Sequence, residues 1–306
     1  MHWGQIKTLF ILCFLLLDIY LLYLVMVKQE EADIDTKTNP EVSIEQQLES
    51  ENIVIDTELP KDPDDEAFIS INQRRFSEDD LEQIEKLNNQ QTKVVEDKFI
   101  ISIFEEPVAL PEDPGEDIIS SIVQNNVVYP TEYEFDSWNK DLNVLVFFQK
   151  KNDRPVYFNQ NGMILVFLDN ENKMIGYTQS MLGEPSVRND KKPLIKPIRA
   201  IKVLYDNLQL GWGETVTDIE MGYHMMLPLD NGVHVLVPTW KVTVDENKNR
   251  YVNAVERFVF PVNDNEMLID AIETTIERVR LIEDEAELKM DLIQWLNSKI
   301  QEIESE

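Results

Sequence analysis

The sequence predicts an α+β protein, in which an N-terminal transmembrane helix precedes two similar helix-plus-antiparallel-sheet subdomains and a C-terminal helical extension. Three observations predict it: a long apolar run near the start, strand patterns separated by turn residues in the middle, and helical periodicity after Pro261. Of the 306 residues, roughly 200 remain for the two subdomains, which is enough to bury a hydrophobic core.

The composition excludes several classes of protein. Asp and Glu number 58 against 28 Lys and Arg, a formal net charge of −30, so the chain repels phosphate backbones and no nucleic-acid partner is expected. The single cysteine, Cys13, lies inside the apolar run. The rest of the chain can therefore form neither a disulfide nor a thiolate metal site, and its stability must come from packing.

The apolar run over residues 9–27 is predicted to be a transmembrane helix, behind a short tail over residues 1–8. Its 19 residues would span about 28 Å as a helix, close to the thickness of a hydrocarbon core. A cleavable signal peptide is the rival interpretation, but the run is longer than a typical signal core and no small-residue cleavage pattern follows it. Lys7 on one side balances Lys28 and Lys37 on the other, so charge alone leaves the orientation open.

Asp18 lies in the middle of this run. An ionised carboxylate at that depth costs on the order of 2.5–3.5 kcal/mol, so the side chain is expected to be protonated or to meet a polar group of another chain. The alternative is a single Asp tolerated among apolar neighbours. The candidate partner-contact residues of this segment are Asp18, Trp3, Lys7, Tyr20 and Tyr23.

Residues 28–66 are predicted to form an acidic linker. From residue 29 onward they contain fourteen Asp or Glu against Lys37 and Lys61, with three prolines and no sustained apolar period. Such a composition is typical of a solvated spacer.

Residues 67–185 are predicted to form the first α+β subdomain. A short strand over residues 68–72 is followed by a helix with Ser77 as its N-cap, a strand over residues 98–104, and a helix from Ile118 to about Asn125. A meander of four strands is then predicted around residues 144–149, 156–159, 163–168 and 173–179.

Residues 186–262 are predicted to form the second subdomain, because the same order of helix and meander returns. Its helix runs from Ile198 to Leu208 and is expected to end before Gly211. Three strands follow, over residues 216–227, 233–244 and 250–260. Residues 263–306 form the acidic helical extension, for which packing on the domain is favoured over the alternative of a partner-binding helix pair.

A shared metal site is not predicted for the two histidines of the second subdomain. If residues 231–232 form a two-residue hairpin, His224 pairs with Thr239 and His234 with Leu229, which places the imidazoles on opposite faces of the sheet. A bulge near the turn could change this register. Even then, no acid stands at metal-ligand spacing beside either histidine.

No catalytic, cofactor-binding or metal-binding residue is predicted, and the chain is not expected to be an enzyme. The sequence contains no GxSxG motif and no phosphate-binding glycine loop, and Gly211-Trp212-Gly213 lacks the setting of a dinucleotide site. The many carboxylates carry little information about acid catalysis in so acidic a chain. An envelope hydrolase would need a catalytic set that is not found.

Several short segments resemble, in matching order, the YycI (WalI) regulatory proteins of Gram-positive bacteria, which accompany the essential cell-wall two-component system. The first runs from Trp3 to Ile11 and continues into the apolar run, with Asp18 where the family is expected to have Asn. The later segments carry an aromatic or strand motif: Tyr177-Thr178-Gln179, Ala200 to Tyr205, Gly222-Tyr223, Pro238 to Val242 and Tyr251 to Ala254. The resemblance covers about residues 1–262.

The resemblance implies a single-pass protein of the cell membrane with a cytoplasmic N-terminus, residues 9–27 in lipid and an extracytoplasmic main domain. It also implies association with the related YycH protein in a heteromeric complex. Control of the YycG (WalK) sensor histidine kinase, through transmembrane and extracytoplasmic contacts, would follow, and the kinase's own helices would then be partners for Asp18.

A second hypothesis is an extracytoplasmic module that senses or binds a component of the cell envelope. The two hypotheses differ in where the activity lies. A regulator that acts through its anchor predicts partial activity on the kinase for a chain truncated after about residue 40, whereas a sensing module predicts full loss.

Overall fold

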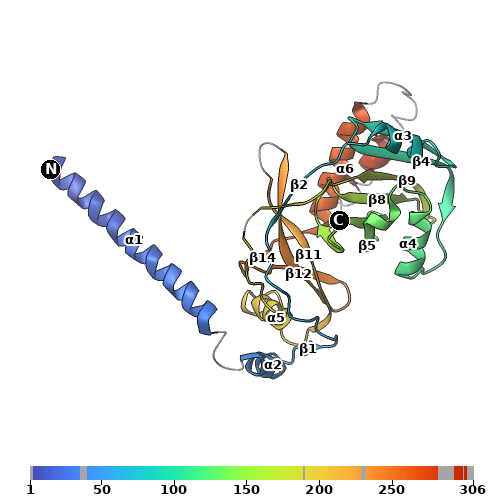
Figure 1. Cartoon of the computed structure of the whole chain (residues 1–306). Coiled ribbons are helices and arrows are strands. Elements are labelled where there is room, and N and C mark those ends of the chain that lie inside the picture. Colours follow the sequence, from blue (N-terminus) through green and yellow to red (C-terminus); the bar gives the residue numbers. More distant parts are fainter. Residues whose placement is uncertain are drawn as a thin grey trace.

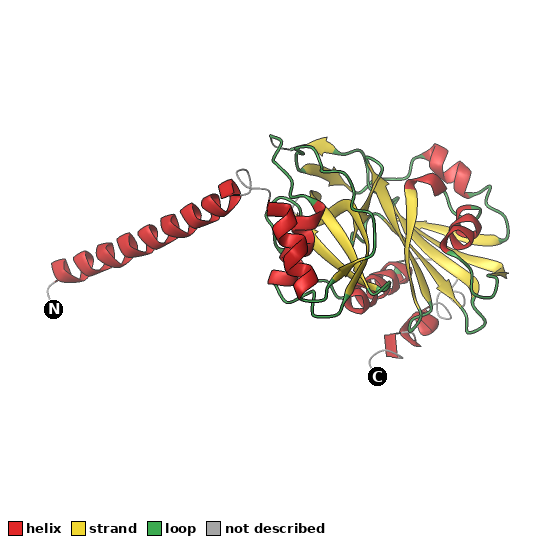
Figure 2. Ribbon diagram, turned by 90° about the horizontal axis from the view of Figure 1, so that it is seen from below, coloured by secondary structure: helices red, strands yellow, loops and turns green. Residues whose placement is uncertain are grey.

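The computed structural model describes residues 3–34, 40–188, 190–228, 232–281, 293–298 and 300–301. Within these residues, a long N-terminal helix projects away from a compact body of helices and strands, as Figures 1 and 2 show. The predicted α+β class is confirmed, because fourteen described strands join into one mainly antiparallel sheet.

The N-terminal helix, α1 (Trp3–Ile34), is 32 residues long and includes the whole predicted span of residues 9–27. Its side chains from Lys7 to Tyr23 are all exposed, so this part of α1 does not pack on the body. Judged by length and hydropathy, no helix in the described part of the chain qualifies as a membrane span.

The predicted linker contains structure that the sequence analysis missed. Helix α2 (Pro40–Ser50) is followed by a short strand, β1 (Val54–Ile55), which pairs in parallel with β11 of the main sheet. Ile44 and Leu48 lie one turn apart on α2, and both are buried against α5. The prediction of a solvated spacer is therefore wrong over residues 40–55, because two apolar side chains at helical spacing are enough to dock an otherwise acidic segment.

The first half of the body is built on an antiparallel sheet with α3 (Glu78–Ile84) and α4 (Glu116–Gln124) on one face. Its strands are β3 (Gln90–Val95), β4 (Phe99–Ala109), β5 (Tyr133–Asn139), β6 (Val144–Lys151), β8 (Met163–Leu168) and β9 (Lys173–Ser180). Ser77 is the N-cap of α3 as predicted, and it forms a capping box with Asp80, in which each side chain accepts a hydrogen bond from the other residue's backbone N–H. Strands β3 and β5 were not predicted, since β3 is largely polar and β5 is interrupted by a bulge between Phe135 and Ser137.

The second half contains α5 (Pro197–Asp206) and the longest strands. Its strands are β2 (Ile69–Asn72), β10 (Ser186–Val187), β11 (Thr215–Pro228), β12 (Val233–Val244), β13 (Lys248–Asn253) and β14 (Val259–Phe260). The single strand expected over residues 250–260 is thus two strands, separated by a turn in which Arg257 has a φ of 61°. Strand β2, assigned by sequence to the first subdomain, pairs with β12 in the second half.

One short strand connects the two halves. Strand β7 (Arg154–Tyr157) pairs antiparallel with β6 and parallel with β11, so the two predicted subdomains share one continuous sheet. The first half is covered on its second face by α6 (Asp264–Arg280) and by helical residues 293–298. The apolar stripe of α6, including Leu268, Ile272 and Ile276, packs against this sheet, as the packing interpretation of the extension predicts.

Candidate functional site

The candidate partner-contact residues lie on α1. Lys7 and Asp18 are eleven positions apart, which places them within about 20° of one another around the helix and about 16 Å apart along its axis. Tyr20 and Tyr23 lie on the opposite side of α1 and are 57% and 61% exposed. Trp3 begins the helix, and its side chain lies outside the described part. The partner role of all five remains a prediction.

The surface of α1 around Asp18 is apolar on every side. Thirteen large apolar side chains between Leu9 and Tyr23 are each at least 48% exposed. Exposed apolar surface of this extent is rare on soluble monomers and marks contact with a membrane or another protein. Asp18 is therefore an acidic group surrounded by apolar side chains on the surface of α1.

A buried ion pair joins the two halves of the body, and it was not predicted from the sequence. Lys241 of β12 places its Nζ 2.8 Å from Oδ1 of Asp136 on β5 and 3.1 Å from Oε1 of Glu220 on β11. Burial lowers the pKa of Lys241, but the charges of Asp136 and Glu220 outweigh it and raise the pKa above its usual value. The ring of Tyr157 lies against Lys241, 5.7 Å from Nζ to the ring centre, and completes the contact.

The two histidines lie on opposite faces of the sheet, although the register differs from the predicted one. His224 pairs with Val237 and His234 with Pro228. The pairing is already shifted by one residue at His234, and a bulge between Met225 and Leu227 shifts it by one more at His224. The His224 ring stacks on Phe260 at 3.9 Å, and burial lowers its pKa to about 4.

His234 lies instead beside two amides. Its ring nitrogens are 3.3 and 3.1 Å from the side-chain nitrogens of Asn159 and Asn161. In the part of the chain that the structure describes, no group of three His, Cys, Asp or Glu side chains is arranged to hold a metal ion.

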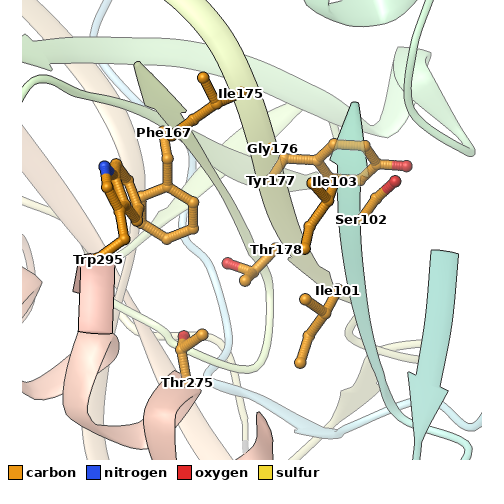
Figure 3. Close-up of a pocket in the computed structure, with 10 residues that line it drawn as sticks. All are labelled: Ile101, Ser102, Ile103, Phe167, Ile175, Gly176, Tyr177, Thr178, Thr275 and Trp295. Atoms are coloured by element: carbon orange, nitrogen blue, oxygen red, sulfur yellow. The ribbon is translucent and has the colours of Figure 1, made fainter. Parts of the chain in front are cut away.

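An apolar pocket lies between the first-half sheet and the C-terminal helices, and Figure 3 shows its lining. Its volume is about 170 Å³. Strands β4, β8 and β9 provide the floor, and Thr275 of α6 and Trp295 lie on the opposite side. The lining is apolar and open to solvent, so an apolar ligand bound there would remove it from water.

The pocket exists because a glycine interrupts the face of β9. Gly176 lies opposite Phe167 and Ile103, so the strand bears no side chain between these two walls. A Cβ at this position would come within 2.6 Å of the Ser102 carbonyl oxygen, which shows how closely β4 approaches here. Sequence analysis did not single out this glycine, since one glycine in a strand also fits a bulge or a close backbone contact.

Comparison with known proteins yields a family. A family model described as YycI protein matches residues 32–255, more than two thirds of the chain. No curated protein matches.

Two solved structures are similar in arrangement. An uncharacterized protein from Eubacterium rectale ATCC 33656 is 12% identical with a TM-score of 0.43, over 69% of this chain and 91% of that one. YycH from Bacillus subtilis is 14% identical with a TM-score of 0.40, over 72% of this chain and 62% of YycH.

Proposed function

This chain belongs to the YycI family of regulatory proteins, and from that premise we propose that it is a membrane-anchored, non-catalytic regulator of a YycG (WalK)-type sensor histidine kinase in a cell-wall two-component system. The observation that carries the proposal is the exposed apolar surface of α1, which projects from the body (Figure 1). Exposed apolar surface of this kind marks contact with a membrane or with another protein.

In this proposal, residues 9–27 span the cell membrane with the N-terminus in the cytoplasm and the body outside. Asp18 then lies within the lipid, where a carboxylate that is neither protonated nor bonded is costly. A polar group on a neighbouring kinase helix would stabilise it, because interhelical hydrogen bonds contribute to helix association in membranes. Trp3, Lys7, Tyr20 and Tyr23 are the accompanying contact candidates.

Regulation then follows from a shift between two states of the kinase. A bound helix changes the kinase only to the extent that it binds one state more tightly than the other. A YycH-type protein is proposed as a second partner, bound through the extracytoplasmic body in a heteromeric complex. The alternative hypothesis of a ligand-sensing module is favoured by a separate observation, the apolar pocket of Figure 3.

Site-directed crosslinking in membranes tests the kinase contact. Photoreactive residues at Leu17 and Ile19 flank Asp18, and a photoreactive residue at Val187, which is 75% exposed on β10, serves as a control outside the anchor. We expect the kinase to be crosslinked from Leu17 or Ile19 and not from Val187. Recovery of only a homo-oligomer of this chain from the anchor positions would contradict the proposal.

A further inference from the structure

The apolar pocket of Figure 3 has a lining without charge. Its ten lining residues include no Asp, Glu, Lys or Arg. The hydroxyl of Ser102 bonds to Gln90 and Thr92, and that of Thr275 bonds to the Ala271 carbonyl within α6. Figure 3 shows the Tyr177 hydroxyl pointing away from Trp295. The pocket therefore suits a hydrocarbon group, and its volume of about 170 Å³ resembles the ~150 Å³ of an apolar cavity that takes up benzene.

An arginine stands beside one end of this pocket. Arg278 follows Thr275 by three residues on α6, so the two side chains are neighbours on the same helical face. Its guanidinium carbon lies 4.1 Å from the centre of the Phe99 ring. Phe99 and the pocket residue Ile101 are two positions apart on β4, so their side chains lie on the same face, about 7 Å apart along the strand. Arg278 therefore contacts Phe99, whose neighbour on the same face of β4, Ile101, lines the pocket.

The charge of Arg278 is poorly compensated. Burial lowers its pKa, and the field of Glu96 only partly opposes this effect. Among the described residues, no carboxylate forms an ion pair with Arg278, whereas Arg74, Arg75 and Arg154 each have one. Within the described residues, the guanidinium donors of Arg278 are thus without a bonded carboxylate, and an anionic group can accept from them.

We propose that the pocket and Arg278 together bind an anionic amphiphile, whose hydrocarbon chain lies in the pocket beside Trp295 and Phe167, which contact each other edge to face, and whose carboxylate or phosphate pairs with Arg278. The two parts of such a ligand match the two observations. The tail fills a void that the protein leaves apolar, and the head supplies the acceptors that a guanidinium binds in bidentate fashion. This inference does not depend on the proposed regulation of a kinase.

Quenching of tryptophan fluorescence tests the tail. The probe is 8-bromooctanoate, added to the full chain in phosphatidylcholine nanodiscs, because a bromine atom in the pocket would lie beside Trp295. We expect saturable quenching in the wild type and its loss in Trp295→Phe. Thr275→Leu, which fills the pocket from α6, should also abolish it. Non-saturable quenching, or equal saturable quenching in Trp295→Phe, would overturn the proposal.

A second comparison tests the head. Arg278→Met keeps an apolar contact with Phe99 but removes the charge, so the affinity for 8-bromooctanoate should fall by at least about tenfold. The matched control is Arg280→Met, two residues along the same helix and exposed, which should bind as the wild type does. 8-Bromooctanol, with the same tail and no charge, should bind the wild type as weakly as 8-bromooctanoate binds Arg278→Met. Equal affinity for the acid and the alcohol would refute the role of Arg278.

The source of the ligand is distinguished by a further arm. Nanodiscs that contain phosphatidylglycerol with brominated chains present the same chemistry from the membrane, without added octanoate. Quenching of Trp295 in these discs would identify a lipid, and quenching by 8-bromooctanoate alone a soluble amphiphile. Absence of Trp295 quenching in both arms would overturn the proposal.

Discussion

Replacing Lys241 by Met should destabilise the body far more than removing an ordinary surface ion pair. The side chains of Lys241 and Asp136 are only 11% and 10% exposed, and Glu220 is 35% exposed. Without the ammonium group, Asp136 remains as a buried charge with no cation, a change that costs about 3–5 kcal/mol in buried pairs. Loss of packing is small, because Met has a similar length and replaces the apolar stem of Lys.

The comparison variant is Lys248→Met. Lys248 also contacts two carboxylates, Asp245 at 2.9 Å and Glu214 at 3.3 Å, but its side chain is 46% exposed. Surface pairs of this kind contribute about 0–1 kcal/mol, so this variant should unfold near the wild-type midpoint.

Urea unfolding of the full chain in nanodiscs, followed by circular dichroism, measures the difference. Adding Asp136→Asn to Lys241→Met should restore part of the loss, since it removes the uncompensated charge. If Lys241→Met and Lys248→Met unfold within about 1 kcal/mol of each other, the buried pair does not stabilise the contact between the two halves and the reasoning fails.

Three further predictions concern the anchor, the strand contact and pH. Asp18→Leu should leave membrane insertion intact and weaken kinase co-purification by about three- to thirtyfold, the range of interhelical hydrogen bonds in lipid, whereas an unchanged yield would contradict a partner contact. Gly222→Ala should destabilise the body by about 1–3 kcal/mol in thermal unfolding, because the new methyl would lie 2.7 Å from the Pro155 carbonyl oxygen; Gly115→Ala, with nothing within 4 Å, is the control. Burial lowers the pKa of His224 to about 4, so between about pH 6.5 and that value the unfolded chain binds more protons than the folded one. The contribution of His224 to the free energy of unfolding should therefore be fully present above about pH 6.5, and it should fall by on the order of 3 kcal/mol as the pH drops to about 4. His224→Phe should flatten this dependence, and an unchanged pH profile would count against it.

Local features of this protein could be predicted from sequence where a short segment decides its own structure. The Ser77 capping box starts α3 where expected, and the apolar runs of β6 and β8 identify two buried strands. Helices α4 and α5 also begin within two residues of their predicted starts, since an apolar stripe fixes their periodicity.

Features that depend on residues far apart in the sequence could not be predicted. Nothing in the local sequence distinguishes the charged residues of the buried ion pair from other charged residues. They meet only because β5, β11 and β12 place Asp136, Glu220 and Lys241 side by side. The predicted pairing of His224 differed by two residues: one is already present at the Pro228–His234 pair, and the other comes from a bulge inside β11 that leaves no clear mark in the sequence. The pocket likewise requires Gly176 of β9 and Trp295 to face each other across separate elements.

The docking of α2 limits how far α1 can be displaced relative to the body. A flexible linker over residues 28–66 could extend for more than about 100 Å, and a body held in that way would transmit little from the membrane. Instead, Leu48 and Ile44 fix α2 to α5 of the second half, and α1 continues as a helix to Ile34. The chain from Ile34 to Pro40 reaches at most about 20 Å. A displacement of α1 larger than this reach must therefore move α2 with the body or break the α2 contact.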